Sequence, residues 1–158
     1  MKLNSLISAR IAKGAAVLAV SLAAVMAGSG SADATVTSTH NFENASTRRC
    51  MDDSQAYGLR PIGCNGGPYQ QWTAPDWWTT GKVVNSVTSN CLDDSLAYGL
   101  RAIPCNGSNF QYWHRYMVAD GNTRISNSAT GRCLDDSIDG GLRAFPCNEL
   151  EWQGWFYF

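Results

Sequence analysis

One pattern occurs three times in this chain of 158 residues, and no other feature constrains the fold as strongly. Each copy has two cysteines fourteen positions apart and a tryptophan eight positions after the second cysteine. The three sets are Cys50, Cys64 and Trp72; Cys91, Cys105 and Trp113; and Cys133, Cys147 and Trp155. The first cysteines recur at intervals of 41 and 42 residues, which indicates one supersecondary unit used three times.

Each copy is expected to consist of short strands and turns. An asparagine lies six positions before the first cysteine, between apolar residues and turn-forming ones: Asn44, Asn85 and Asn127. This arrangement predicts a strand and a tight turn, followed by strands at the first cysteine, before the second cysteine, and at Gln-x-Trp. No segment after the N-terminal region shows a helical period, so the sequence predicts an all-β domain.

The first 34 residues have the features of a secretory signal peptide. Lys2, Arg10 and Lys13 give a positive start, residues 15–27 are almost entirely apolar, and small residues precede an expected cleavage after Ala34. A membrane anchor is the alternative, but the apolar run is shorter than the roughly 20 residues that span a bilayer. We therefore expect a single secreted domain at 35–158, with repeats at about 38–78, 79–120 and 121–158, and no membrane association after cleavage.

Charge and cysteine content narrow the possible partners and the cellular compartment. The chain has 12 basic and 13 acidic residues, and removal of residues 1–34 leaves 9 against 12, a net charge of −3 without a basic patch. Nucleic acid is therefore not an expected partner. All six cysteines lie in the predicted secreted part, and an even number there predicts disulfides.

Six cysteines allow 15 pairings, of which the threefold symmetry favours the one within each repeat. The predicted bonds are Cys50–Cys64, Cys91–Cys105 and Cys133–Cys147. Zinc coordination is the alternative, but no Cys-x-x-Cys or Cys/His spacing supports it. We expect neither a metal nor a cofactor.

Three copies of Asn-x5-Cys-(Leu/Met)-Asp, a second cysteine and Gln-x-Trp closely resemble the ricin B-chain-like lectin family, over about residues 38–158. The resemblance implies a β-trefoil: three four-stranded units around a pseudo-threefold axis, with the Gln-x-Trp tryptophans in the core. It also implies a non-catalytic protein that binds sugars, commonly galactose, xylose or their polymers, in up to three shallow pockets. The predicted function is secreted carbohydrate binding, with an extracellular glycan or polysaccharide as partner. A trefoil without sugar sites, serving as a protein-interaction module or inhibitor, is the alternative.

The resemblance also implies which residues bind sugar. In the family, the aspartate two residues after the first cysteine binds sugar hydroxyls, and an ionised carboxylate suits a vicinal diol. The matching residues here are Asp52, Asp93 and Asp135. The glutamine of Gln-x-Trp is expected to orient that aspartate: Gln70, Gln111 and Gln153.

The chain departs from the family pattern at the aromatic platform. The usual aromatic residue two positions before the second cysteine is present only as Phe145, because Ile62 and Ile103 occupy the other two copies. Tyr57 and Tyr98 offer substitute stacking surfaces, where the third copy has a glycine. Each repeat is thus predicted to keep one aromatic ring, by one of two routes. The asparagine usual before Gln-x-Trp is replaced by Tyr69, Phe110 and Trp152.

An arginine follows each candidate aspartate by eight positions: Arg60, Arg101 and Arg143. An Asp–Arg bridge that holds a loop is one interpretation. Arginines that point outward toward an anionic sugar, such as a uronic acid, are the other. Trp77-Trp78 is unrepeated and is expected to be buried, although exposed tandem tryptophans can bind polysaccharide.

The expected placement of the paired aspartates argues against an enzymatic function. Paired aspartates could serve glycoside hydrolysis, which needs two carboxylates across one substrate. Adjacent strand residues point to opposite faces, so Asp52 and Asp53 should not share a pocket. Three equivalent sites instead suit multivalent binding to a polymer.

His40 and His114 are not spaced like metal ligands or catalytic residues, and we expect them to be structural. Nothing in the sequence indicates oligomerisation, so we expect a monomer.

Overall fold

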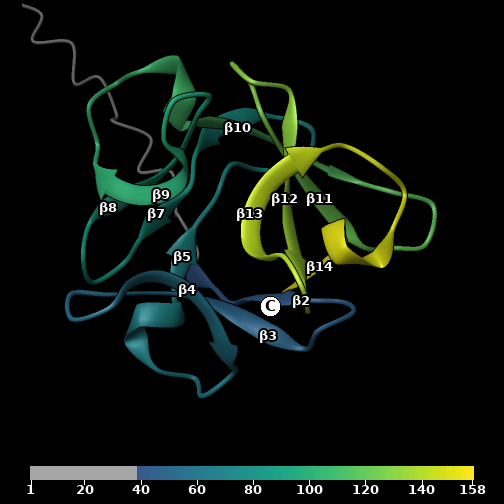
Figure 1. Ribbon diagram of the computed structural model, residues 1–158, viewed down its shortest axis with the longest axis horizontal. Coiled ribbons are helices and arrows are strands. Elements are labelled where there is room, and N and C mark those ends of the chain that lie inside the picture. The colour runs from purple at the N-terminus through teal and green to yellow at the C-terminus, as the bar shows by residue number, and fades with distance from the viewer. Residues whose placement is uncertain (1–38) are drawn as a thin grey trace, which may run out of the picture. The chain divides into compact units, whose positions relative to one another are not determined.

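The computed structural model describes residues 39–158, which form an all-β arrangement of short strands (Figure 1). The predicted signal peptide lies outside these residues. Within residues 39–158 there is no α-helix, and three single 3-10 turns supply the helical geometry that is present. No helix there is long and apolar enough to cross a membrane.

The strands follow the same order in each third of the described chain. The first third contains β1 Thr39–His40, β2 Phe42–Asn44, β3 Arg49–Ser54, β4 Gly58–Gly63, η1 Pro68–Gln70 and β5 Trp72–Thr73. The second contains β6 Thr80–Lys82, β7 Val84–Asn85, β8 Asn90–Ser95, β9 Gly99–Pro104, η2 Asn109–Gln111 and β10 Tyr112–Met117. The last contains β11 Thr123–Asn127, β12 Arg132–Ser137, β13 Gly141–Pro146, η3 Glu151–Gln153 and β14 Trp155–Tyr157.

Each third has one long hairpin, made by β3–β4, β8–β9 and β12–β13, all antiparallel. The hairpins turn at a glycine with positive φ, +66° at Gly58, where an L side chain would be strained. The register places each candidate aspartate directly opposite the arginine eight positions later, as in Asp52↔Arg60. The spacing of eight in the sequence is therefore a cross-strand pair in the structure.

The remaining strands join the thirds to one another. The last strand, β14, pairs with β2, so that Trp155 lies opposite Asn44 and the chain closes on itself (Figure 1). Strand β5 pairs with β7, and β10 pairs with both β11 and β6. Each Gln-x-Trp strand therefore adds to the strand that opens the next third, which is the closure expected of three units around an axis.

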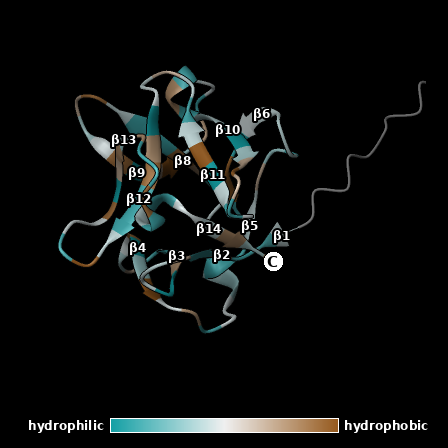
Figure 2. Ribbon diagram, turned by 90° about the vertical axis from the view of Figure 1, so that its right-hand side faces the viewer, coloured by the Kyte–Doolittle hydropathy of each residue, from teal (hydrophilic) through white to brown (hydrophobic). Residues whose placement is uncertain are grey.

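The hydrophobic core consists of symmetry-related triplets. One triplet comes from the start of each third, in or beside its opening strands, one from the residue after the first cysteine, and one from Gln-x-Trp. The members are Phe42, Val83 and Ile125; Met51, Leu92 and Leu134; and Trp72, Trp113 and Trp155. Each tryptophan also donates its indole N–H to the backbone carbonyl of the second triplet, as from Trp113 to Leu92 at 2.8 Å. Hydrophobic residues (brown in Figure 2) lie along strands such as β11 and also on outer loops.

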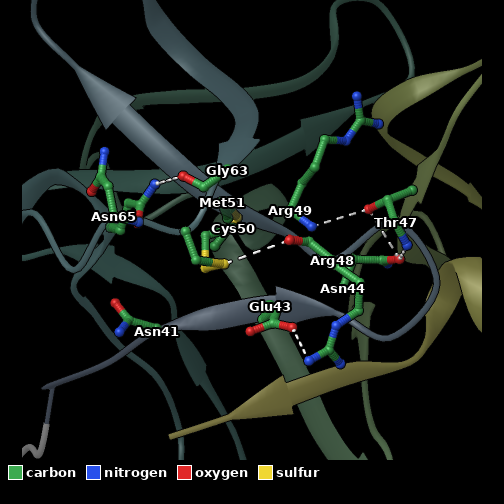
Figure 3. The surroundings of a disulfide bond; sticks show 12 residues. Asn41, Glu43, Asn44, Thr47, Arg48, Arg49, Cys50, Met51, Gly63 and Asn65 are labelled. Atoms are coloured by element: carbon green, nitrogen blue, oxygen red, sulfur yellow. Dashed lines mark hydrogen bonds and ion pairs between the residues drawn. A yellow bond between two sulfur atoms is a disulfide. The ribbon is translucent and has the colours of Figure 1, made fainter.

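All three predicted disulfides are confirmed: Cys50–Cys64, Cys91–Cys105 and Cys133–Cys147. Each ties the start of the hairpin's first strand to the region just after its second, with Cα–Cα distances of 4.9–5.0 Å. Figure 3 shows the first bond beside the Arg48 backbone and the Glu43–Arg48 ion pair. Glu43 is near both sulfurs, but these are bonded to each other and are not available as thiolate ligands. Three disulfides suit an oxidising environment.

The repeated asparagines join neighbouring thirds. Asn85 donates to the Tyr69 carbonyl at 2.7 Å, and its side-chain oxygen accepts from the backbone N–H groups of Val87 and Thr88. Asn44 and Asn127 make the corresponding bonds, to the carbonyls of Trp152 and Phe110. All three side chains are buried, so their fixed position in the sequence has a structural cause.

Candidate functional site

Each hairpin carries the same three-membered constellation on its outer face: a carboxylate, a guanidinium and an aromatic ring. The arginine Nε donates to the aspartate Oδ1 at 3.3 Å for Arg60–Asp52, 2.9 Å for Arg101–Asp93 and 3.0 Å for Arg143–Asp135. The predicted Asp–Arg bridge is therefore present in all three thirds. It involves the first aspartate of each pair because the hairpin register sets that residue opposite the arginine.

The guanidinium also lies over an aromatic ring. The distance from the arginine Cζ to the ring centroid is 4.2 Å for Arg60 over Tyr57, 4.6 Å for Arg101 over Tyr98, and 4.3 Å for Arg143 over Phe145. Such cation–π contacts contribute about 0.5–1 kcal/mol at exposed sites. The three rings that the sequence selected thus belong to equivalent sets, although they come from different strand positions.

The ring changes position because of one glycine. In the third hairpin, a Cβ on Gly140 would lie 2.0 Å from Nη1 of Arg143, so a tyrosine equivalent to Tyr98 cannot coexist with this arginine conformation. Phe145, opposite Cys133 on the neighbouring strand, supplies the ring instead. Each described hairpin therefore has one ring in contact with its arginine, from one of two chain positions.

Exposure differs sharply within each set. The aspartate side chains are only 2–5% exposed, whereas the arginine side chains are 34–38% exposed. Tyr57 and Tyr98 are 72% and 74% exposed, and Phe145 is 39% exposed. The aspartate lies at the base, and the surface that a ligand meets consists mainly of the guanidinium and the ring.

Pockets lie over two of these sets. In the second third, a pocket of about 380 Å³ is lined by Asp93, Tyr98 and Arg101, together with Asn106 and Phe110. In the last third, a pocket of the same volume is lined by the equivalent residues Asp135, Phe145, Arg143, Asn148 and Trp152. The matching linings show that the threefold pattern extends from the backbone to the surface.

The pockets include an aromatic residue that was not among the predicted site residues. It immediately precedes the glutamine of Gln-x-Trp, as Phe110 or Trp152. The available signal was its recurrence, because Tyr69 occupies the same position in the first repeat. An aromatic residue at this position in all three repeats could have marked it as part of the site.

The glutamines play a different part from the one expected. All three are fully buried, and each accepts from one backbone N–H and donates to one carbonyl around the turn that follows the second cysteine, as Gln111 does with Asn106 and Pro104. Only Gln153, among the described contacts, also donates to its aspartate, to Asp135 Oδ2 at 3.2 Å. Gln70 and Gln111 donate to the carbonyls of Gly63 and Pro104, and no hydrogen bond joins them to an aspartate among the described contacts, so the expected direct contact is found only for Gln153.

The second aspartate of each pair points away from the pocket, as expected for adjacent strand residues. Asp94 Oδ2 accepts from Thr130 at 2.5 Å and from Arg132 at 3.0 Å, both of the next third. Asp53 and Asp136 face the other two seams between thirds. In the three described hairpins, the two carboxylates of an Asp-Asp pair therefore contact different parts of the protein.

Trp77 and Trp78 are more exposed than predicted. Trp78 is 65% exposed, in a turn where its own φ is +62°, and Trp77 is 38% exposed. Arg115 is buried between the rings of Trp77 and Tyr157, with Cζ 4.2 Å from each centroid, and so takes the space that burial of Trp77 would fill. The expectation of burial was therefore wrong, most clearly for Trp78.

The two histidines take structural positions in this region. His40 stacks on Tyr157 with ring centroids 3.9 Å apart, and His114 stacks on Tyr116 at 5.6 Å. Burial, and then the positive charge of Arg115, lower the pKa of His40 below its usual value.

No family model matches this sequence, and no curated protein sequence matches it. Solved structures do. A BEL β-trefoil has a TM-score of 0.66 at 10% identity, over 76% of this chain and 91% of that one. A Polyporus squamosus lectin with a bound glycan epitope has a TM-score of 0.61 at 16% identity, over 77% of this chain and 48% of the lectin. An exo-β-1,3-galactanase from Clostridium thermocellum has a TM-score of 0.66 at 23% identity, over 77% of this chain and 30% of the enzyme.

These matches confirm the predicted fold: the chain is a β-trefoil, a class that lectins and parts of carbohydrate-active enzymes share. Identities this low establish the fold alone. The β-trefoil architecture that the resemblance implied is thereby confirmed, over about three quarters of the chain.

Proposed function

We propose that this β-trefoil is a secreted, non-catalytic carbohydrate-binding protein with one shallow sugar site on each hairpin. The observation that carries the proposal is the threefold recurrence of carboxylate, guanidinium and ring, with equivalent pockets over two of the sets. Secretion is proposed from the signal-like residues 1–34, followed by a single domain at 35–158, and is supported by the three disulfides.

The geometry suggests a division of roles within a site. The aspartate fixes the arginine Nε, and the exposed part of the guanidinium can donate to sugar hydroxyls. In the second site, Asp93 lines the pocket, and its Oδ2 accepts no hydrogen bond from the described chain, so we expect this oxygen to accept from a ligand hydroxyl. The Arg101 guanidinium as donor and the Asp93 carboxylate as acceptor, side by side in the pocket, match two neighbouring hydroxyls of a sugar. The ring of Tyr98 offers an apolar face to the sugar ring. Since the Asp–Arg pair carries no net charge, a neutral sugar suits these sites best.

Three such sites suit a polymeric ligand. Each pocket is small and open to solvent on the ring side, so a single site is expected to bind weakly. A polysaccharide that reaches two or three sites gains avidity without any new contact. We therefore expect much tighter binding to a galactan- or xylan-type polymer than to its monosaccharide.

The test is a glycan and polysaccharide array probed with the oxidised protein 35–158, followed by titration of the best hit by calorimetry. Tyr98→Ala and Arg101→Gln should each weaken binding at the second site by about tenfold, or about 1.4 kcal/mol. Trp78→Ala removes an equally exposed ring outside all three sites and serves as the matched control. It should leave the affinity unchanged.

Two outcomes would overturn this proposal. A blank array from well-folded protein would favour the alternative, an extracellular protein-interaction module or inhibitor. Loss of binding in Trp78→Ala, with normal binding in Tyr98→Ala, would move the site to the unrepeated tryptophans.

A further inference from the structure

A further pocket of the described chain lies mainly outside the three repeat sites and shares only Asn148 with the pocket over the last third. It has a volume of about 520 Å³ and lies between the β10–β11 hairpin and the turn that follows Cys147. Its lining includes Tyr116, Asp120, Arg124, Asn148 and Glu149. The volume falls within the range typical of small-molecule sites.

Arg124 is the unusual residue of this pocket. It is only 5% exposed, on β11 directly opposite Tyr116. Its Nε is enclosed without a hydrogen-bond partner, and none of the six ion pairs among residues 39–158 includes it. The other buried arginine of the described chain, Arg115, lies between two aromatic rings, which Arg124 does not.

A buried guanidinium without a counterion lowers stability, because its lost hydration is not replaced. Arginine cannot avoid this cost by losing its proton, since its pKa is too high. Its terminal nitrogens, which likewise make no hydrogen bond in the described chain, are not among the enclosed atoms and so remain open to the pocket. The guanidinium of Arg124 therefore has no anionic partner, and a ligand with a negative charge could supply one.

The two carboxylates of the lining do not supply it. Asp120 and Glu149 are both exposed and neither forms an ion pair with Arg124. Asp120 instead accepts the backbone N–H of Asn122 at 2.9 Å, which holds it in the hairpin turn. At the rim their charges are screened by solvent and salt, whereas the buried charge of Arg124 is screened much less.

We propose that this pocket is a fourth, unrepeated ligand site that binds the carboxylate of an acidic sugar, a uronic acid. The guanidinium presents a planar pair of donors that matches a carboxylate. Tyr116, Asn148 and the two rim carboxylates offer hydroxyl and amide groups and acceptors to the remaining hydroxyls of the sugar. The proposal goes beyond the repeat sites and does not depend on them.

The experiment is a titration of the isotopically labelled protein 35–158 with D-glucuronate, D-glucose and acetate, followed by NMR. Glucuronate should shift the signals of Tyr116 and Arg124, which line this pocket and neither of the two repeat pockets, and glucose and acetate should each bind at least tenfold more weakly. Arg124→Gln should abolish these shifts while the free variant unfolds at the same temperature as wild type or higher. Arg48→Gln removes one exposed positive charge elsewhere and should leave glucuronate binding unchanged.

Several results would overturn the proposal. Acetate binding as tight as that of glucuronate would reduce the site to a general anion site. A marked loss of stability in Glu149→Gln would mean that Glu149 is the counterion of Arg124. Glucuronate shifts confined to the hairpin residues Tyr98 and Arg101 would place acidic sugars at a repeat site instead, a result separate from failure of the neutral-sugar proposal.

Discussion

Arg132→Ala is expected to destabilise this protein strongly, because it removes a buried ion pair between two repeats. Asp94 is fully buried at the seam between the second and last thirds, and Arg132 is its cationic partner. Arg132 donates to both carboxylate oxygens, through Nε at 3.0 Å and through Nη2, and to the Ser95 carbonyl at 3.1 Å. Alanine leaves Asp94 with only the hydroxyl of Thr130.

The expected loss follows from the cost of an unpaired buried charge. Removal of one partner of a buried ion pair costs about 3–5 kcal/mol. The Arg132 side chain is 24% exposed, so water reaches the gap and the lower end, about 3 kcal/mol, applies. For a domain of this size, such a loss lowers the melting temperature by roughly 10 °C.

The protein contains its own control at the seam between the first two thirds. There Asn90 replaces the arginine and donates a single bond to Asp53 at 3.1 Å. Asn90→Ala should cost about 1.5 kcal/mol, the loss of one hydrogen bond to a charged group. Arg132→Asn, which copies the natural asparagine seam, should fall between the two alanine variants.

The assay is urea unfolding of the oxidised protein, monitored by tryptophan fluorescence. The expected order of destabilisation is Arg132→Ala, Arg132→Asn, then Asn90→Ala. Equal losses for Arg132→Ala and Asn90→Ala would refute the reasoning, because the paired charge would then add nothing to a neutral hydrogen bond.

Two further predictions concern the core and the pH dependence. Trp113→Phe should cost about 2 kcal/mol in the same assay, because it keeps most of the ring but leaves the Leu92 carbonyl without its indole donor; a loss below 0.5 kcal/mol would contradict this. The lowered pKa of His40, due to burial and then to Arg115, means that the unfolded chain binds the proton first. Its contribution to stability is therefore complete above the unfolded pKa of about 6.5 and falls as the pH drops toward the lower folded value. Thermal melts of wild type and His40→Gln between pH 7.5 and 5 should converge at the acidic end, and parallel curves would rule this out.

Contacts within one repeat could largely be predicted from the sequence. The cysteine spacing of fourteen and the threefold symmetry gave the correct disulfides. The spacing of eight between Asp93 and Arg101 suggested their bridge, since both lie in one hairpin. These contacts join residues that are close in the sequence. Each occurs in all three repeats, so the spacing that indicates it can be read three times.

Two sequence-based predictions were wrong: the hydrogen-bond partner of two glutamines and the burial of the unrepeated tryptophans. Gln70 and Gln111 were expected to contact aspartates but donate to the carbonyls of Gly63 and Pro104, which the pattern of residue types does not reveal. Trp78 was expected to be buried, but Arg115, 37 positions further on, lies beside its neighbour Trp77. The contact between Arg115 and Trp77 does not recur in the other repeats, so the repeat pattern does not predict it.

The sequence by itself determined the repeat, the all-β class and the disulfides, and its resemblance to ricin B-chain-like lectins implied the tryptophan core and the three candidate sites. Only the tertiary structure decided how the sites are presented: how the arginine is stacked on Tyr98 or Phe145, and that the ring before Gln-x-Trp lines the pocket. It alone revealed the Asp94–Arg132 seam and the unpaired Arg124. The physical reason is that burial and charge pairing depend on contacts between segments that are distant in the sequence. The repeat pattern indicates only the strands and turns within one repeat.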